Sequence, residues 1–243
     1  MALLLLFYGF LWRLLLLLVY VHKALLSWLR VRLWDRCRWP SGGDRRPHKV
    51  PVHIGLLVAE EPSLEAVADL VVWCSSLGVS YISVYDQDGN FQKNNAHLLD
   101  AIMQQQQQQD LLGADGSKYN IEFLSSDKHG VLLCRPRVMV LSPEDGKQSI
   151  VHAAQQLCRS VENKETSYKD ISVSMLDSLL REMNIPDPEL VVKFGPVDST
   201  LGFLPWHIRL TEFISLPSHK KISFDDLLAA LQRYSSCQQR LGQ

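Results

Sequence analysis

The run PVHIGLLVA occupies residues 51–59 of the chain. After its first proline it is continuously apolar apart from His53 and Gly55, which is typical of a strand buried on both faces of a parallel sheet. From Pro62 onward apolar residues recur at helical spacing, and Gly78 stands where a helix C-terminal cap belongs. The folded part therefore opens with a buried strand followed by a helix.

Strand-like and helix-like segments alternate along the rest of the chain. Further strands are expected at 79–85, 131–141 and 190–194, and further helices at 91–109, from 142, at 172–184 and at 223–240. The helix that starts at 142 carries an apolar stripe that we expect to face the core: Ile150, Val151, Ala154, Leu157, Cys158 and Val161. This alternation predicts an α/β fold, a mostly parallel central sheet with helices on both faces, whose ligands bind at the carboxyl ends of the strands.

The helix at 91–109 ends in six consecutive glutamines, Gln104 to Gln109. A tract of one residue type is low in sequence complexity. We interpret it as an extension of the helix without chemical consequence.

Residues 1–34 are interpreted as a hydrophobic membrane anchor. Arg13 is the one charged residue between Leu3 and Val21, and these nineteen residues are enough to span a bilayer core. Arg13 costs about 2.5–3.5 kcal/mol near mid-span, less than the summed gain from the Leu, Phe and Val residues at about 0.3–0.6 kcal/mol each. We therefore expect insertion, either across the bilayer or flat in the headgroup layer.

Residues 35–49 are interpreted as a basic linker between the anchor and a folded domain at 50–243. From Lys23 to Lys49 the chain has eight Lys and Arg residues against two aspartates. A basic excess beside an apolar segment indicates a flank that faces the cytosol and anionic lipid headgroups. If the anchor spans, the domain is therefore cytosolic.

The overall composition excludes several other classes of protein. The net charge is -1, and the basic residues gather beside the apolar segment, so no nucleic-acid partner is expected. The five cysteines are widely spaced, without a CxxC pair, which predicts reduced thiols rather than a disulfide framework or a zinc site.

The opening run resembles the first strand of the cis-prenyltransferases, which extend farnesyl diphosphate with isopentenyl diphosphate. In that family a histidine is followed, after five residues, by Asp-Gly-Asn-x-Arg. His53 falls on the family's histidine, the metal-binding Asp falls on Ala59, and the diphosphate-gripping Arg falls on Ser63. The resemblance therefore implies a strand that is kept and a catalytic loop that has lost its chemical groups. His53 itself is interpreted as a structural histidine.

A second resemblance covers KFGPVDSTLGFLPW, residues 193–206, followed by Thr211 and Glu212. It keeps the spacing of the family's Arg-Thr-Gly-Gly-Glu-x-Arg-x-Ser-Asn-Phe-Leu-x-Trp. The matching positions are Gly195, Phe203, Leu204, Trp206 and Glu212. The two arginines and the serine that hold isopentenyl diphosphate in the family fall on Lys193, Ser199 and Leu201. We expect Phe203 and Trp206 to serve packing.

The end of the chain resembles the Arg-x-Gly that family members send across a dimer into the neighbour's site. Its residues are Arg240, Leu241 and Gly242. The resemblance implies that this tail binds the partner's substrate, isopentenyl diphosphate, while Ala59 and Ser63 leave no catalytic residue in this chain. Glu212 matches a family metal ligand, but without the Asp at position 59 no bound metal is expected here, so Mg²⁺ belongs to the partner.

Together these resemblances imply a non-catalytic accessory chain of a heteromeric cis-prenyltransferase at the endoplasmic reticulum membrane. Its partner would be a catalytic cis-prenyltransferase chain, and the product would be the polyprenyl diphosphate precursor of dolichol for protein glycosylation. An alternative is a membrane receptor or lipid-trafficking partner without an enzymatic role, for which the resemblance implies Nogo-B as ligand. A third interpretation, an autonomous enzyme, is disfavoured by Ala59 and Ser63.

Overall fold

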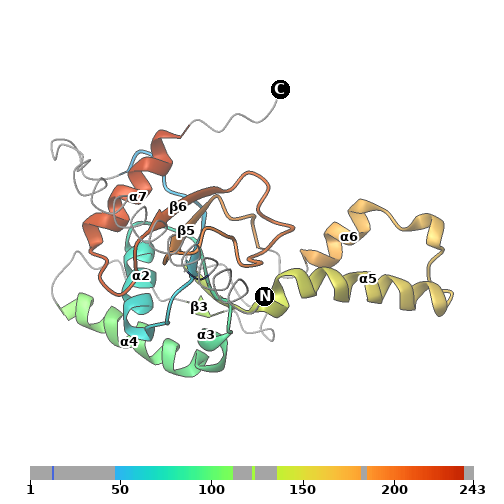
Figure 1. Cartoon of the computed structure of the whole chain (residues 1–243), viewed down its shortest axis with the longest axis horizontal. Helices are drawn as coiled ribbons and strands as arrows, with labels where there is room; N and C mark the ends of the chain where they lie inside the picture. Colours follow the sequence, from blue (N-terminus) through green and yellow to red (C-terminus); the bar gives the residue numbers. More distant parts are fainter. Residues whose placement is uncertain (1–12, 14–46, 112–121, 124–135, 182–184, 238–243) are drawn as a thin grey trace, which may run out of the picture. The chain divides into compact units, whose positions relative to one another are not determined.

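A computed structural model of the chain describes residues 13, 47–111, 122–123, 136–181 and 185–237 (Figure 1). Every helix and strand named below belongs to one compact unit, Arg45–Gln243. The expected anchor apart from Arg13, most of the expected linker, and the tail from Arg240 to Gly242 lie outside the described residues. Over the residues that the structure does describe, no helix is both long enough and apolar enough to cross a membrane.

Six parallel strands form a single sheet in the order β3-β4-β2-β1-β5-β6. They are β1 (His53–Val58), β2 (Tyr81–Asp86), β3 (Glu122–Phe123), β4 (Arg137–Leu141), β5 (Leu190–Phe194) and β6 (Glu212–Leu216). Val58 lies opposite both Asp86 and Phe194, and Phe194 lies opposite Leu216. The carboxyl ends of the four strands β2, β1, β5 and β6 therefore meet at one edge, and the predicted parallel sheet is confirmed.

Three helices begin within two residues of the expected position, each after a capping serine. The helix expected from 142 begins only at Lys147, after a 3-10 turn, and the helix expected at 91–109 is divided into two. The helices are α2 (Leu64–Ser76), α3 (Asn90–Lys93), α4 (Asn95–Leu111), α5 (Lys147–Glu162), α6 (Val173–Leu180) and α7 (Phe224–Ser236), with 3-10 turns η1 (Pro143–Asp145) and η2 (Tyr168–Asp170). Ser63, Ser172 and Ser223 each accept a hydrogen bond from their own helix's first turn. The glutamine tract lies within α4. The last helix ends at Ser236, before the expected end near Arg240.

Helices α2, α4 and α7 pack on one face of the sheet, around residues such as Leu56, Leu70, Ile102 and Leu231, all fully buried. The other face carries a smaller cluster, to which a loop rather than a helix contributes. Its members are Leu57, Tyr85, Leu141, Val191, Phe203 and Leu204. Within the described residues, the prediction of helices on both faces is therefore met on one face only.

Helix α5 departs from the prediction that its apolar stripe faces the core. Of that stripe only Leu157 is buried, while Val151 is 45% exposed and Ala154 and Cys158 also face solvent. The reason is that α5 packs on η1 and α6 and has no sheet face beneath it (Figure 1). Helical periodicity reports that one side of a helix is apolar, and here no described residue covers most of that side.

Candidate functional site

The loop Ala59–Ser63 and the loop that starts at Gly195 meet at the carboxyl edge of the sheet. The Ala59 N–H donates to the Phe194 carbonyl at 2.8 Å. Gly195 has φ +106, and a Cβ there would lie 3.0 Å from both the carbonyl carbon and the carbonyl oxygen of Ala59. Glycine is required because the two backbones approach this closely.

The loop after β1 is closed by residues that follow β6. The carboxylate of Glu60 accepts hydrogen bonds from the Ser218 hydroxyl at 2.8 Å and the His219 main-chain N–H at 2.8 Å. It also accepts from Nδ1–H of the His219 ring, and Nε2 of that ring accepts from the Ser63 N–H at 2.9 Å. These partners make His219 neutral, with its proton on Nδ1. Glu60, Ser63, Ser218 and His219 are called the edge clamp below.

Burial and hydrogen bonding together set the protonation of the edge clamp. The His219 side chain is fully buried, and burial lowers its pKa although the neighbouring Glu60 works in the opposite direction. For Glu60 burial acts to raise the pKa, but the hydrogen bonds from His219 and Ser218 outweigh it and the pKa is lowered. Near neutral pH the clamp is therefore a carboxylate held by a neutral imidazole.

The edge clamp engages two of the N–H groups that could otherwise bind an anion. A helix N-terminus attracts phosphate through its free N–H groups, but here the Ser63 N–H donates to His219 and the Ala66 N–H donates to the Ser63 hydroxyl. Beside them stand Glu60 and Glu61, and Glu61 holds Lys220 at 2.9 Å. In the described part of the chain, no group of three or more His, Cys, Asp or Glu residues is arranged to hold a metal ion.

The residues at the positions that bind isopentenyl diphosphate in the family have other partners in this chain. Lys193 is only 7% exposed, and its ammonium group pairs with Asp198 at 3.1 Å. The Ser199 hydroxyl accepts from the Leu201 N–H at 3.2 Å, and the Leu201 carbonyl accepts from the Tyr85 hydroxyl at 2.7 Å. These contacts shape the loop, and they leave one buried ammonium group where the family has two guanidinium groups.

Phe203 has the packing role that the sequence suggested. It is fully buried and meets Tyr85 edge to face, with 5.6 Å between ring centroids. A Cβ at Gly55 would lie 2.7 Å from the Phe203 ring, so the glycine in the opening run makes room for this aromatic side chain. The loop after β5 is thereby fixed to the sheet.

Glu212 lies at the amino ends of the strands, whereas Ala59 lies at their carboxyl ends. Glu212 pairs with Leu190 at the start of β5, whereas Ala59 follows Val58 at the end of β1. Its carboxylate accepts a hydrogen bond from the Cys237 thiol at 2.8 Å. A single copy of this chain therefore does not bring Glu212 to position 59.

His53 is a satisfied structural histidine. Its Nδ1–H donates to the Pro186 carbonyl at 2.6 Å, and its Nε2 accepts from the Ser83 hydroxyl at 2.7 Å. Burial lowers the pKa of His53 to about 4, so the ring is neutral near pH 7.

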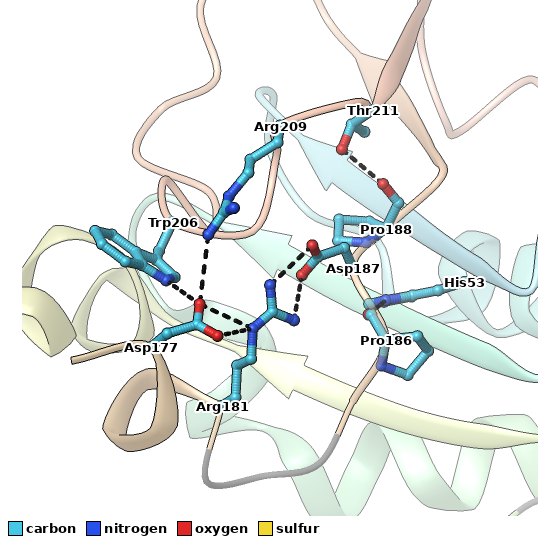
Figure 2. A network of polar contacts seen from close by, with 9 residues as sticks. All are labelled: His53, Asp177, Arg181, Pro186, Asp187, Pro188, Trp206, Arg209 and Thr211. Atoms are coloured by element: carbon cyan, nitrogen blue, oxygen red, sulfur yellow. Dashed lines mark hydrogen bonds and ion pairs between the residues drawn. The ribbon is translucent and has the colours of Figure 1, made fainter. Parts of the chain in front are cut away.

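A network of polar contacts connects α6 to the loop between β5 and β6 (Figure 2). No sequence pattern revealed it. Asp177 accepts from Trp206 Nε1–H at 2.8 Å and from Arg181 Nε–H at 2.9 Å. Arg181 also holds both carboxylate oxygens of Asp187, at 2.8 and 3.0 Å, and Arg209 reaches Asp177 at 3.4 Å. Trp206, which was expected to serve packing, is half-buried and has a polar partner in Asp177.

The parallel sheet and its two edge loops define the cis-prenyltransferase class of fold. Residues 135–242 match the family model Prenyltransf, described as "Putative undecaprenyl diphosphate synthase". The crystal structure of lavandulyl diphosphate synthase from Lavandula x intermedia superposes with a TM-score of 0.58 at 18% identity, covering 80% of this chain and 99% of that one. This likeness shows that the fold is shared.

Two curated relatives identify the family within that class. The chain is 46% identical to the human "Dehydrodolichyl diphosphate synthase complex subunit NUS1", covering 97% of this chain and 98% of the human protein. The mouse protein of the same name is also 46% identical, with the same coverage. The chain belongs to this family of dehydrodolichyl diphosphate synthase complex subunits. The sequence-based resemblance to a subunit of a heteromeric cis-prenyltransferase complex is thereby confirmed.

Proposed function

We propose that this chain is the non-catalytic, required subunit of a heteromeric cis-prenyltransferase. The complex condenses isopentenyl diphosphate with farnesyl diphosphate to make the polyprenyl diphosphate precursor of dolichol, which serves protein glycosylation. The names of the human and mouse relatives support membership of such a complex. The observation that carries the proposal is the edge clamp, in which Glu60 and His219 fill the loop that binds metal and diphosphate in the enzymes the sequence resembles.

Electrostatics argues that the chain is inactive alone. A diphosphate needs Mg²⁺, guanidinium groups or clustered N–H groups to offset its charge. The loop after β1 presents Glu60 and Glu61 instead, and Ala59 has no metal ligand to offer. The charge of Lys193 is already offset by Asp198. Mg²⁺ and the reacting diphosphates are therefore assigned to the partner chain.

An apolar surface that no residue of the described ranges covers supports docking to another chain. Six residues of α5 line a groove on its exposed side: Ile150, Val151, Ala154, Gln155, Cys158 and Arg159. Strand β6 is an edge strand of the sheet, and its Phe213 is 38% exposed. Contiguous exposed apolar surface and an unpaired strand edge are both features of protein interfaces. We call the groove side of α5 the α5 face and assign it to the catalytic chain.

The two ends of the chain complete the proposal. Residues 1–34 anchor the complex to the endoplasmic reticulum membrane, with the folded domain in the cytosol, and Arg240, Leu241 and Gly242 reach the substrate in the partner's site. The partner is a catalytic cis-prenyltransferase chain, in a heterodimer or a larger assembly. An arginine suits this task because its guanidinium group can hold a diphosphate with two parallel hydrogen bonds.

Purification of the full chain from its native membrane tests the proposal. We expect a catalytic cis-prenyltransferase to copurify in near-equal amount, and protease added to sealed microsomes to digest the folded domain. Full protection of the domain, with Nogo-B or a lipid-transport protein as the copurifying species, would instead support the receptor or lipid-trafficking alternative.

A further inference from the structure

Helices α5 and α6 form a pair that depends on few contacts with the rest of the unit. Ala153 and Leu157 are the buried residues of α5, and α6 has none. Figure 1 shows the two helices side by side, joined through η2. With so little buried apolar surface, packing alone does not fix the orientation of this pair relative to the sheet.

Arg181 connects the pair to segments that the sheet itself holds (Figure 2). On one side its Nε–H donates to Asp177 within α6. On the other side its two terminal nitrogens hold Asp187. This residue lies between two carbonyls, one bound by a residue of β1 and the other by the residue that precedes β6. These are the Pro186 carbonyl, which accepts from His53, and the Pro188 carbonyl, which accepts from Thr211. A rigid guanidinium group therefore joins α6 to a segment fixed at both β1 and β6.

The charges of this network balance. Asp177 and Asp187 carry two negative charges, and Arg181 and Arg209 carry two positive ones. The Trp206 N–H adds a neutral donor to Asp177 from the loop before β6. The side chains of Asp177, Arg181 and Asp187 are each about one-third exposed, so the network is partly shielded from water. Bidentate, networked pairs of this kind hold geometry better than an isolated surface pair.

We propose that Arg181 is a latch that fixes the α5–α6 pair to the sheet in the orientation in which the catalytic chain docks on the α5 face. The docking half of this inference rests on the proposed function. The part of the inference that makes Arg181 a latch concerns this chain alone, because the contacts of Arg181 are all within the chain. Arg181 is thus a positioning residue that touches no substrate.

Hydrogen exchange of the purified full chain tests the latch half. In Arg181→Ala, amides of α5 and α6 should exchange about tenfold faster, while amides of β1 and α2 keep their rates. Arg181→Lys keeps the charge but loses the planar guanidinium group. Its exchange rates in α5 and α6 should lie between those of the wild type and those of Arg181→Ala. Lys220→Ala, which removes the exposed pair with Glu61, is the matched control and should change nothing in α5 or α6. Unchanged exchange in α5 and α6, or equal acceleration in β1 and α2, would overturn the latch.

Affinity for the catalytic chain tests the docking half. Arg181→Ala should weaken binding about tenfold, with Arg181→Lys intermediate. If Arg181→Ala does not fold, Trp206→Phe takes its place, because it removes one hydrogen-bond donor to Asp177. It can be used both for hydrogen exchange and for the affinity measurement. Faster exchange in α5 and α6 with unchanged affinity would overturn the link to docking while leaving the proposed function intact. Failure of the wild-type chain to bind the catalytic chain would overturn the proposed function, and the exchange result would still decide the latch.

Discussion

The carboxylate of Glu60 accepts hydrogen bonds from both the main-chain N–H and the ring Nδ1–H of His219. Because the other ring nitrogen accepts from the Ser63 N–H, one buried imidazole joins the loops after β1 and β6. The chain thus fills, with its own side chains, the position at which the resemblance places a diphosphate.

Removal of the Glu60 carboxylate should destabilise the fold. In Glu60→Ala the buried N–H groups of His219 lose their acceptor, and we expect the free energy of unfolding to fall by about 1–3 kcal/mol. Glu61→Ala is the matched control, because that side chain is 86% exposed and holds one surface pair. It should change stability by less than about 0.5 kcal/mol. Urea unfolding of both variants makes the comparison, and equal stabilities would show that the edge clamp contributes nothing.

Acid should destabilise the folded chain through His53. Its pKa is about 4 when folded, against 6.5 for an unperturbed histidine. Between these two pH values the unfolded chain binds more protons than the folded chain, so the free energy of unfolding falls as pH drops. The loss from His53 is about 3 kcal/mol by pH 4. His53→Gln should flatten the dependence of urea unfolding on pH in this window, and an unchanged slope would contradict the assignment.

A charge on the α5 face should weaken assembly without affecting folding. Val151 is 45% exposed, so Val151→Asp leaves the core intact. It places a carboxylate in the apolar groove, and we expect affinity for the catalytic chain to fall at least about tenfold. Gln156→Asp adds the same charge to α5 at an exposed position that does not line the groove. Titration calorimetry with the catalytic chain distinguishes the two, and equal affinities would remove the α5 face from the interface.

The tail should affect turnover more than assembly. Arg240→Ala should lower turnover of the complex at least about tenfold, which corresponds to about 1.4 kcal/mol of lost transition-state stabilisation. Arg240 follows the last apolar turn of the expected final helix, so copurification with the catalytic chain should be unchanged. Steady-state elongation assays measure the effect. Normal kinetics from the variant complex would reduce this subunit to an anchor and a scaffold.

The sheet could largely be predicted from sequence because its central strands are continuous apolar runs. Strand β5 was predicted at 190–194 and is found there, since all of its residues are buried. Strand β6 was missed because it is an edge strand in which exposed and buried residues alternate over only five positions. Strand β3 has two residues, too few for any pattern.

The candidate site could be predicted only where its residues lie within one short stretch of sequence. The end of β1 gave the positions of Ala59 and Ser63, and hence the absence of a metal ligand and of a guanidinium group. The closing contact between Ser63 and His219 spans 156 positions along the chain, and no local pattern indicates such a pair. The same holds for Asp177 and Trp206. The α5 stripe was misassigned to the core because a pattern of apolar residues does not show whether another part of the chain covers them.

Elongation of farnesyl diphosphate by the purified chain alone tests the central claim most directly. We expect no product with isopentenyl diphosphate and Mg²⁺, and none from Ala59→Asp, because the edge clamp and the missing guanidinium groups remain. Addition of the catalytic chain in equal amount should give polyprenyl diphosphate at a rate well above that of the catalytic chain alone. Turnover by the isolated chain, or no stimulation of its partner, would contradict the account.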